Sequence, residues 1–378
     1  MKNLIKISHS KKTIPISEPV MSGNEKKYVL DCIDSNWISS QGKYLNIFEE
    51  HVKKLTGARY ALAVSNGTVA LQLALKTLGI SKNDEVIVPN LTFAATVNSV
   101  INVGARPVIV DVDINNWTIS LREVRKKITK NTKAIMPVHL YGHPVDMNSL
   151  IKICKSKGIK IIEDCAEALG AYYKGKHVGI FGDIGTFSFY GNKLITTGEG
   201  GMLIFKNKKN YNIAKILRDH GMSDKKRYYH TMIGSNYRMT NLQAAVGCGQ
   251  MENFKKLYFR RKLLFERYFF NLKNITSIKF QKIEKWAQSS YWLYTILVRK
   301  KKERNKLIKY LQIEKIQTRP LFIPIHKMKI YKNYVKNFRE NFLCSEIISN
   351  FGISLPSSSS LTLKKVDLIC NKIKEFYK

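Results

Sequence analysis

The sequence predicts an α/β fold, in which a large domain with a mostly parallel sheet of about seven strands is followed by a smaller C-terminal α+β domain. Between residues 60 and 205, short apolar runs alternate with segments of helical period. This alternation is typical of right-handed crossovers between parallel strands that are covered on both faces. After about residue 245 the pattern changes to a long, charged amphipathic segment. We therefore predict a large domain over residues 1–245, including an N-terminal segment, and a small domain over residues 246–378.

The strands of the large domain are predicted from seven apolar runs, at residues 60–64, 85–88, 107–111, 134–138, 159–163, 186–189 and 202–205. The last two runs are too close in sequence for a helical crossover, so we expect one edge of the sheet to be antiparallel. Ligands of such a sheet bind beyond the carboxyl ends of its strands. Residues that follow these runs are therefore the first candidates for a functional site.

The C-terminal part begins with the amphipathic segment 241–271, which is followed by a strand-like run at 291–298. Helical runs then alternate with short turns up to Tyr377. This mixture predicts a smaller α+β domain.

Length and composition favour a folded protein that lies outside membranes. The chain has 378 residues, of which 44% are hydrophobic, enough for a sizeable core. It has no uninterrupted apolar run of about 18 residues, and its first residues lack the apolar block of a signal peptide, so we expect a cytoplasmic protein. The six cysteines show no CxxC spacing and predict neither a metal site nor a disulfide framework.

The formal net charge of +36 raises the question of nucleic-acid binding. The lysines are spread along the whole chain, without a long basic tail, zinc-finger spacing or an aromatic RNA-binding motif. We therefore predict no nucleic-acid partner. A basic surface would still attract anionic metabolites.

Lys193 is the strongest candidate for a catalytic residue. It lies in SFYGNKLITTGEGG (188–201), between an apolar strand, a turn and a glycine-rich exit. This setting suits a partly desolvated lysine, whose neutral amine can attack a carbonyl and form a Schiff base. Asp164 comes at the end of the apolar run that begins at residue 159. A carboxylate there could pair with a pyridinium nitrogen, or it could instead cap a helix. The pair predicts a pyridoxal phosphate enzyme.

Other candidates follow the predicted strands and are ambiguous singly. Gly67 and Thr68 open a helix after the first strand, which suits either a phosphate or an ordinary N-cap. Ser188 could add a phosphate contact or be a core serine. Phe93 could stack on a flat ring or belong to the core. The stretch 234–241, GSNYRMTN, offers an amide and a guanidinium to an anion, or simply starts a helix.

Together these pieces resemble the DegT/DnrJ/EryC1/StrS sugar aminotransferases, a branch of the fold-type I pyridoxal phosphate enzymes. The resemblance runs from Ile14 to the stretch GISLPS at 352–357 and includes DSNWISSQG at 34–42. Its most specific parts are EDCAEALG at 163–170 and GDIGTFSFYGNK at 182–193.

The resemblance implies a role for each candidate residue. Lys193 would form the Schiff base, Asp164 would pair with the ring nitrogen, and Glu167 would lie near the ring hydroxyl. Phe93 would stack on the ring. The phosphate would be held by Gly67, Thr68, Ser188 and, from a neighbouring subunit, Asn236. The family thus implies a homodimer with shared active sites. The substrate cavity would be bordered by Trp37, Ser39, Arg238 and His326.

Three phrases narrow the resemblance further, namely DSNWISS (34–40), VHLYGHPVDM (138–147) and YGNK (190–193). They are most similar to the family members that aminate C4 of GDP-4-keto-6-deoxymannose, with glutamate as the expected donor, in making deoxyaminosugars for polysaccharides such as O-antigen. Departures from the family pattern are Gln72, Tyr190, Ser235, the stretch 247–249 and the serine run 357–360. They leave a UDP- or dTDP-linked 4-keto-6-deoxyglucose open as the substrate.

Two other classes of function remain possible from the sequence. Some relatives use pyridoxamine phosphate to remove a sugar hydroxyl, but they carry histidine where this chain has Lys193, which favours amino transfer. A non-catalytic binding protein is favoured only by the basic surface, and it would be colourless.

Overall fold

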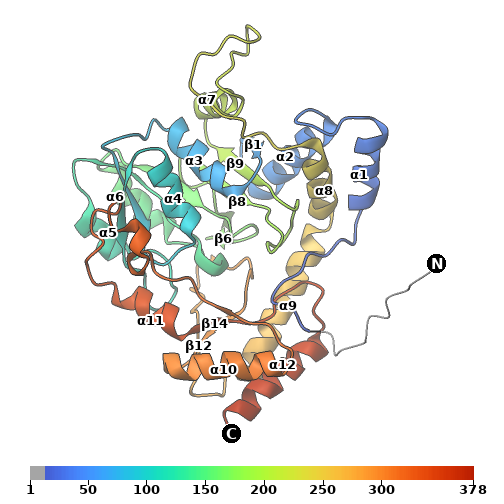
Figure 1. Cartoon of the computed structure of the whole chain (residues 1–378), viewed down its shortest axis with the longest axis vertical. Coiled ribbons are helices and arrows are strands. Elements are labelled where there is room, and N and C mark those ends of the chain that lie inside the picture. The colour runs from blue at the N-terminus through green and yellow to red at the C-terminus, as the bar shows by residue number, and fades with distance from the viewer. Residues whose placement is uncertain (1–12) are drawn as a thin grey trace, which may run out of the picture.

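The computed structural model describes residues 13–378 and has a seven-stranded sheet at its centre (Figure 1). The strand order is β1-β9-β8-β5-β4-β2-β3, which confirms the predicted α/β class and the number of strands. The strands are β1 (Tyr60–Val64), β2 (Glu85–Pro89), β3 (Arg106–Val110), β4 (Thr132–Ile135), β5 (Lys160–Asp164), β8 (Ile184–Ser188) and β9 (Gly201–Phe205).

One edge of the sheet is antiparallel. β9 pairs antiparallel with both β8 and β1, whereas β2, β3, β4, β5 and β8 run parallel. The edge pair of β1 and β9 is therefore antiparallel, as predicted, although β9 itself lies one strand inside the edge. The connection 189–200 is too short for a crossover, so β9 must pair beside β8. β1 then closes the sheet from outside.

Helices cover both faces of the sheet. One face packs against α3 (Gly67–Thr77), α4 (Ala94–Asn102) and α7 (Lys208–Arg218). On α3 the buried residues include Ala70, Leu71, Ala74 and Leu75, a spacing that forms one apolar stripe. The other face packs against α2 (Lys43–Thr56), α5 (Leu121–Lys127), α6 (Met147–Lys155) and α8 (Asn241–Glu252). Strands buried on both sides explain why their sequences are continuous apolar runs.

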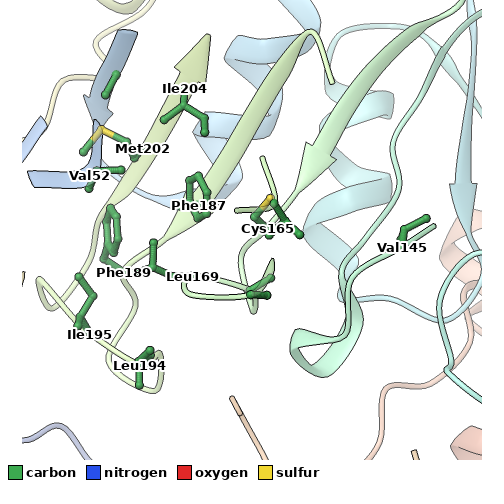
Figure 2. Close-up of a cluster of buried hydrophobic side chains, with 14 of the residues drawn as sticks. Val52, Val145, Cys165, Leu169, Phe187, Phe189, Leu194, Ile195, Met202 and Ile204 are labelled. Atoms are coloured by element: carbon green, nitrogen blue, oxygen red, sulfur yellow. The ribbon is translucent and has the colours of Figure 1, made fainter. Parts of the chain in front are cut away.

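The turn that carries Lys193 is anchored in this core. Figure 2 shows Leu194 and Ile195 beside Phe189, below Phe187 of β8 and Met202 of β9. All five side chains are buried in one cluster. The two residues after the lysine thus fix its turn by apolar packing, because burial of each large side chain contributes about 1.5–3 kcal/mol.

The C-terminal part contains a second sheet, of order β10-β12-β14-β13. Its strands are β10 (Lys279–Phe280), β12 (Thr295–Leu297), β13 (Arg319–Pro320) and β14 (Gly352–Ser354). The predicted strand 291–298 shrinks to β12, because Tyr291 has a φ of 57°, which a strand cannot accommodate. A separate core joins this sheet to α9 (Phe254–Leu272), α10 (Lys301–Ile313) and α12 (Leu363–Phe376). The smaller unit is thus α+β, as predicted.

The predicted boundary at residues 245 and 246 falls within α8, which continues to Glu252 before α9 begins at Phe254. The division into two domains stays a proposal. The remaining elements are α1 (Glu25–Asp34), α11 (Leu343–Phe351), three short 3₁₀ turns (140–142, 325–327 and 329–331) and a small sheet of β6 (Tyr172–Tyr173), β7 (Lys176–His177) and β11 (Ala287–Gln288). Over residues 13–378, every helix is too short or too polar to cross a bilayer.

Candidate active site

A cavity of about 670 Å³ opens at the carboxyl ends of the central strands. Seven of the predicted site residues line it, from loops and strand ends that are far apart in sequence. They are Gly67, Thr68, Phe93, Asp164, Glu167, Ser188 and Lys193. A parallel sheet brings these positions together, since the carboxyl ends of its strands share one edge.

The Lys193 amine lies inside this cavity, with Nζ 4.2 Å from the centroid of the Trp292 ring. Burial lowers the pKa of the amine, while the nearby carboxylates of Glu167 and Asp164 raise it. Desolvation is the larger effect, so the neutral and nucleophilic form is favoured relative to a lysine in water.

Asp164 ends β5 and is held rigidly. Its Oδ1 accepts a hydrogen bond from the Ala166 amide at 3.1 Å, and its Oδ2 accepts one from the Thr96 hydroxyl at 2.9 Å. The Thr96 hydroxyl also contacts that of Thr92 at 2.8 Å. Burial raises the pKa of Asp164, whereas these donors and the charge of Lys193 lower it. Such a carboxylate is oriented to pair with a cationic nitrogen in the cavity.

Glu167 lies one turn beyond Asp164 and is also buried. Its Oε2 accepts a hydrogen bond from the Tyr141 amide at 2.7 Å, where Tyr141 has a left-handed φ of 53°. Burial raises the pKa of Glu167 to about 7. Near neutral pH this carboxyl group can therefore either donate or accept a proton.

An anion cradle is formed by the start of α3 and the end of β8. Asn66 caps the helix by accepting from the Val69 amide at 3.0 Å, so the amides of Gly67 and Thr68 point out of the first turn toward the cavity. A Cβ atom at Gly67 would lie 2.8 Å from Cβ of Ser188. The glycine thus leaves room for the Ser188 hydroxyl beside the helix start. This donor set fits the phosphate of pyridoxal phosphate.

Phe93 provides an aromatic wall. It precedes α4, and 59% of its surface is exposed at the cavity, in contrast to a core phenylalanine. Its ring centroid lies 5.8 Å from that of Phe322. A phosphate cradle, an aromatic face, a carboxylate and a lysine in one cavity are the parts that a pyridoxal phosphate site requires.

Four other predicted residues lie outside this cavity of the same chain. Trp37 and Ser39 belong to the loop between α1 and α2. The Trp37 carbonyl accepts a hydrogen bond from the Asn241 side chain, and the Ser39 carbonyl accepts one from the Asn241 backbone amide, each at 2.6 Å. The Trp37 residue is 54% exposed. Asn236 and Arg238 contact each other at 2.9 Å and follow the loop after α7. Their predicted roles require a neighbouring subunit or another arrangement.

His326 also lies outside the cavity and is buried below the loop after β2. Its Nε2 contacts Glu346 at 3.0 Å, and its backbone amide donates to Asn90 Oδ1 at 3.1 Å. Burial lowers the pKa of this imidazole. These contacts tie the loop to α11, and the predicted contact of His326 with substrate stays a prediction.

Several lining residues were missed from sequence. Trp292, Arg319 and Phe322 reach the cavity from the C-terminal part of the chain, where no local motif marks them. Glu199 lies within the stretch 188–201 that contains Lys193, and Thr96 lies three residues after Phe93, but neither was predicted to line the site. For Arg319 the one available sequence signal was the pair Arg319-Pro320 at a short strand, because a guanidinium at such a position can face an anionic substrate.

A buried group of His139, Glu163 and Cys165 has the residue types of a metal site. Glu163 already accepts hydrogen bonds from the amides of Gly179, Phe181 and Gly182, and it contacts His139 Nε2 at 3.0 Å. These donors satisfy the carboxylate. The group therefore supports the strand end that carries Asp164.

Comparison with known proteins agrees with this geometry. The model of the DegT/DnrJ/EryC1/StrS aminotransferase family matches residues 19–374. The GDP-perosamine synthase of Escherichia coli O157:H7 is 45% identical, covering 97% of this chain and 99% of its own length. That of Vibrio cholerae is 41% identical, covering 96% and 99%. The PLP form of Spr1654 from Streptococcus pneumoniae superposes with a TM-score of 0.91 at 28% identity, covering 96% of this chain and 98% of that one.

The family model spans nearly the whole chain, and the cavity holds seven of the eight residues that the family resemblance assigned to the cofactor, all but Asn236. The chain therefore belongs to the DegT/DnrJ/EryC1/StrS aminotransferase family and is a pyridoxal phosphate-dependent sugar aminotransferase.

Proposed function

We propose that this enzyme transfers an amino group from glutamate to C4 of GDP-4-keto-6-deoxymannose, which yields GDP-perosamine. The observation that carries the proposal is the full-length similarity to two GDP-perosamine synthases, at 45% and 41% identity. The cavity supplies the matching chemistry, because Lys193 and Asp164 face the same space.

Cofactor binding is assigned to the seven lining residues. The phosphate would be held by the amides of Gly67 and Thr68 and by the Ser188 hydroxyl, while Phe93 would cover one ring face. Asp164 would pair with the ring nitrogen, and Glu167 would lie near the ring hydroxyl. When bound, pyridoxal phosphate supplies an electron sink for amino transfer.

The proton transfers are assigned to Lys193. Its Nζ, with a pKa lowered by burial, would take a proton from the carbon of the amino donor and pass it on within the cavity. In the second half of the reaction the same amine returns a proton to C4 of the sugar. The Asp164 carboxylate would pair with the ring nitrogen and stabilise its positive charge. A lysine at this position also favours amino transfer over removal of a sugar hydroxyl.

A substrate panel tests the assignment. The enzyme is incubated with pyridoxal phosphate, glutamate and, in separate reactions, GDP-, UDP- and dTDP-linked 4-keto-6-deoxysugars. We expect an amino sugar, identified by its mass, from GDP-4-keto-6-deoxymannose. Product from a UDP- or dTDP-linked 4-keto-6-deoxyglucose alone would establish the alternative substrate.

We also propose a cytoplasmic homodimer in which Asn236 reaches the cofactor phosphate of the partner subunit. The segment between α7 and Asn236 projects from the body of the chain (Figure 1). It exposes Tyr228, Tyr229 and Ile233, of which the last is 95% exposed. Exposed apolar side chains on a projecting loop favour burial against another protein surface.

Mixing two inactive variants tests the shared site. Lys193→Ala removes the amine that forms the Schiff base. Asn236→Asp disables the phosphate contact, because a carboxylate repels the phosphate. If Asn236 acts in the partner's site, a mixed dimer has one intact site. We then expect mixed, re-equilibrated samples to regain about a quarter of wild-type activity, as random pairing and one working site of two imply. Activity that stays at the level of the unmixed variants would place Asn236 in its own subunit's site or outside any site.

The Thr96 hydroxyl is expected to contribute to cofactor affinity. Thr96→Val removes the 2.9 Å hydrogen bond to Asp164, which raises the pKa of that carboxyl and weakens its pairing with the ring nitrogen. Loss of one such bond costs about 1 kcal/mol, or about fivefold in the dissociation constant of pyridoxal phosphate. Fluorescence titration measures this constant. Thr77→Val is the control, because the Thr77 hydroxyl is buried on α3 without a partner among the described residues; an equal loss in both variants would contradict a specific role.

A further inference from the structure

Arg261 is a buried arginine that none of the assignments above uses. It lies in the middle of α9, with only 2% of its surface exposed, among the largest fully buried side chains of the described residues. Burial lowers the pKa of its guanidinium to about 10, so the group is still charged near neutral pH. A buried charge is costly unless its donors are satisfied, so its contacts are informative.

The guanidinium donates to three neutral oxygens. Nη1 donates to the Trp292 carbonyl at 2.6 Å, and Nη2 donates to the Lys193 carbonyl at 3.1 Å. Nε donates to the Ser359 hydroxyl at 3.2 Å. Two of the three acceptors belong to residues that line the cofactor cavity. The planar fork of arginine suits this task, because it binds two carbonyls at a fixed separation.

These bonds complete a closed network around the lysine turn. The Trp292 indole donates from Nε1 to the carbonyl of Asn192 at 3.0 Å, and the Lys193 amine lies over the same indole ring, 4.2 Å from its centroid. The main chain of Lys193 and the ring that its amine faces are therefore held by one side chain.

The serine run 357–360, which departs from the family pattern, contributes further hydrogen bonds to this network. Ser359 accepts the third bond from Arg261. Ser358 Oγ accepts from the Glu18 amide at 2.7 Å, and Ser357 Oγ accepts from the Tyr294 amide at 2.8 Å. The run thus joins the N-terminal segment and the smaller unit at the point where Arg261 is held.

We propose that Arg261 is a positioning residue for Lys193, which fixes the lysine against Trp292 through their two carbonyls. Its charge, which meets only neutral acceptors, also disfavours protonation of the lysine nitrogen. Other charged groups facing that nitrogen are Glu167 and Asp164, which favour protonation, and Arg319, which opposes it. The proposal depends on the cofactor and not on the sugar, so it can fail independently of the proposed substrate.

Two substitutions separate position from charge. Arg261→Lys keeps the charge but loses the fork, so we expect pyridoxal phosphate to leave the holoenzyme about tenfold faster. The pH midpoint of the visible absorption of bound cofactor should stay at its wild-type value. Arg261→Met loses both the fork and the charge, so we expect release to be equally fast. The pH midpoint should also rise, since removal of a nearby cation stabilises the protonated nitrogen.

Arg267→Met is the matched control, because Arg267 lies on the same helix but pairs with Asp367 at the surface, at 2.6 Å. It should change neither release nor midpoint. Ser359→Ala is a milder variant that should also fold if Arg261→Lys does not, with release about threefold faster. Release at the wild-type rate in folded Arg261→Lys, or in Ser359→Ala, would overturn the positioning role. An unshifted midpoint in Arg261→Met would overturn the charge effect.

Discussion

Replacement of Lys193 by alanine is expected to abolish turnover, with a loss in kcat of about 10⁴-fold or more, because the general base of both half-reactions is removed. The visible absorption of the lysine-bound cofactor should disappear as well. After borohydride reduction, the wild-type peptide that contains residue 193 should carry the mass of the cofactor, whereas the variant peptide should not.

Lys193→Arg is the informative companion to this variant. It keeps a positive charge in the cavity, but a guanidinium is protonated at all ordinary pH values and cannot bind the cofactor covalently. We expect it to be as inactive as Lys193→Ala. Lys160→Ala, at the exposed start of β5, should retain full activity. An active Lys193→Ala enzyme would remove the basis for the proposed mechanism.

Asp164→Asn is expected to lower kcat by about 10³-fold while the protein remains folded, since preorganised electrostatic groups of this kind contribute about 10² to 10³ in rate. Asparagine has nearly the same shape and can still accept from the Ala166 amide. It lacks the negative charge that keeps the ring nitrogen protonated. The effect should therefore appear in kcat more than in the KM for the sugar.

The control for this charge removal is Asp183→Asn. Asp183 accepts from the Ile161 amide at 2.9 Å, at the opposite end of β5 from the cavity. We expect kcat to be unchanged there. If Asp164→Asn were equally active, the carboxylate would not be the partner of the ring nitrogen.

Much of the cofactor site could be predicted from sequence because its residues end an apolar run or follow one within a few positions. Val64 is followed by Gly67 and Thr68, and the strand β8 leads into Lys193. Strands buried on both faces are continuous apolar runs, so their ends are visible in the sequence. In a parallel sheet those ends converge, which places the candidates in one cavity without further information.

The rest of the site could not be predicted because it depends on contacts between distant segments. Thr96 and Asp164 are joined by a side-chain hydrogen bond between a helix and a strand. Trp292 and Arg261 reach Lys193 from the C-terminal part of the chain. Such contacts leave no periodicity or spacing in the sequence. The same is true of His326, which the structure buries between Asn90 and Glu346.

The sequence by itself determined the α/β class, the seven strands and the lysine and carboxylate at their ends, because local apolar periodicity and turn chemistry encode them. Only the tertiary structure decided that β9 lies inside the sheet, next to β1, and that a buried arginine of α9 holds the lysine turn. These features follow from which surfaces pack together after the strands have formed. Packing of that kind is set by the shape and charge of the whole molecule.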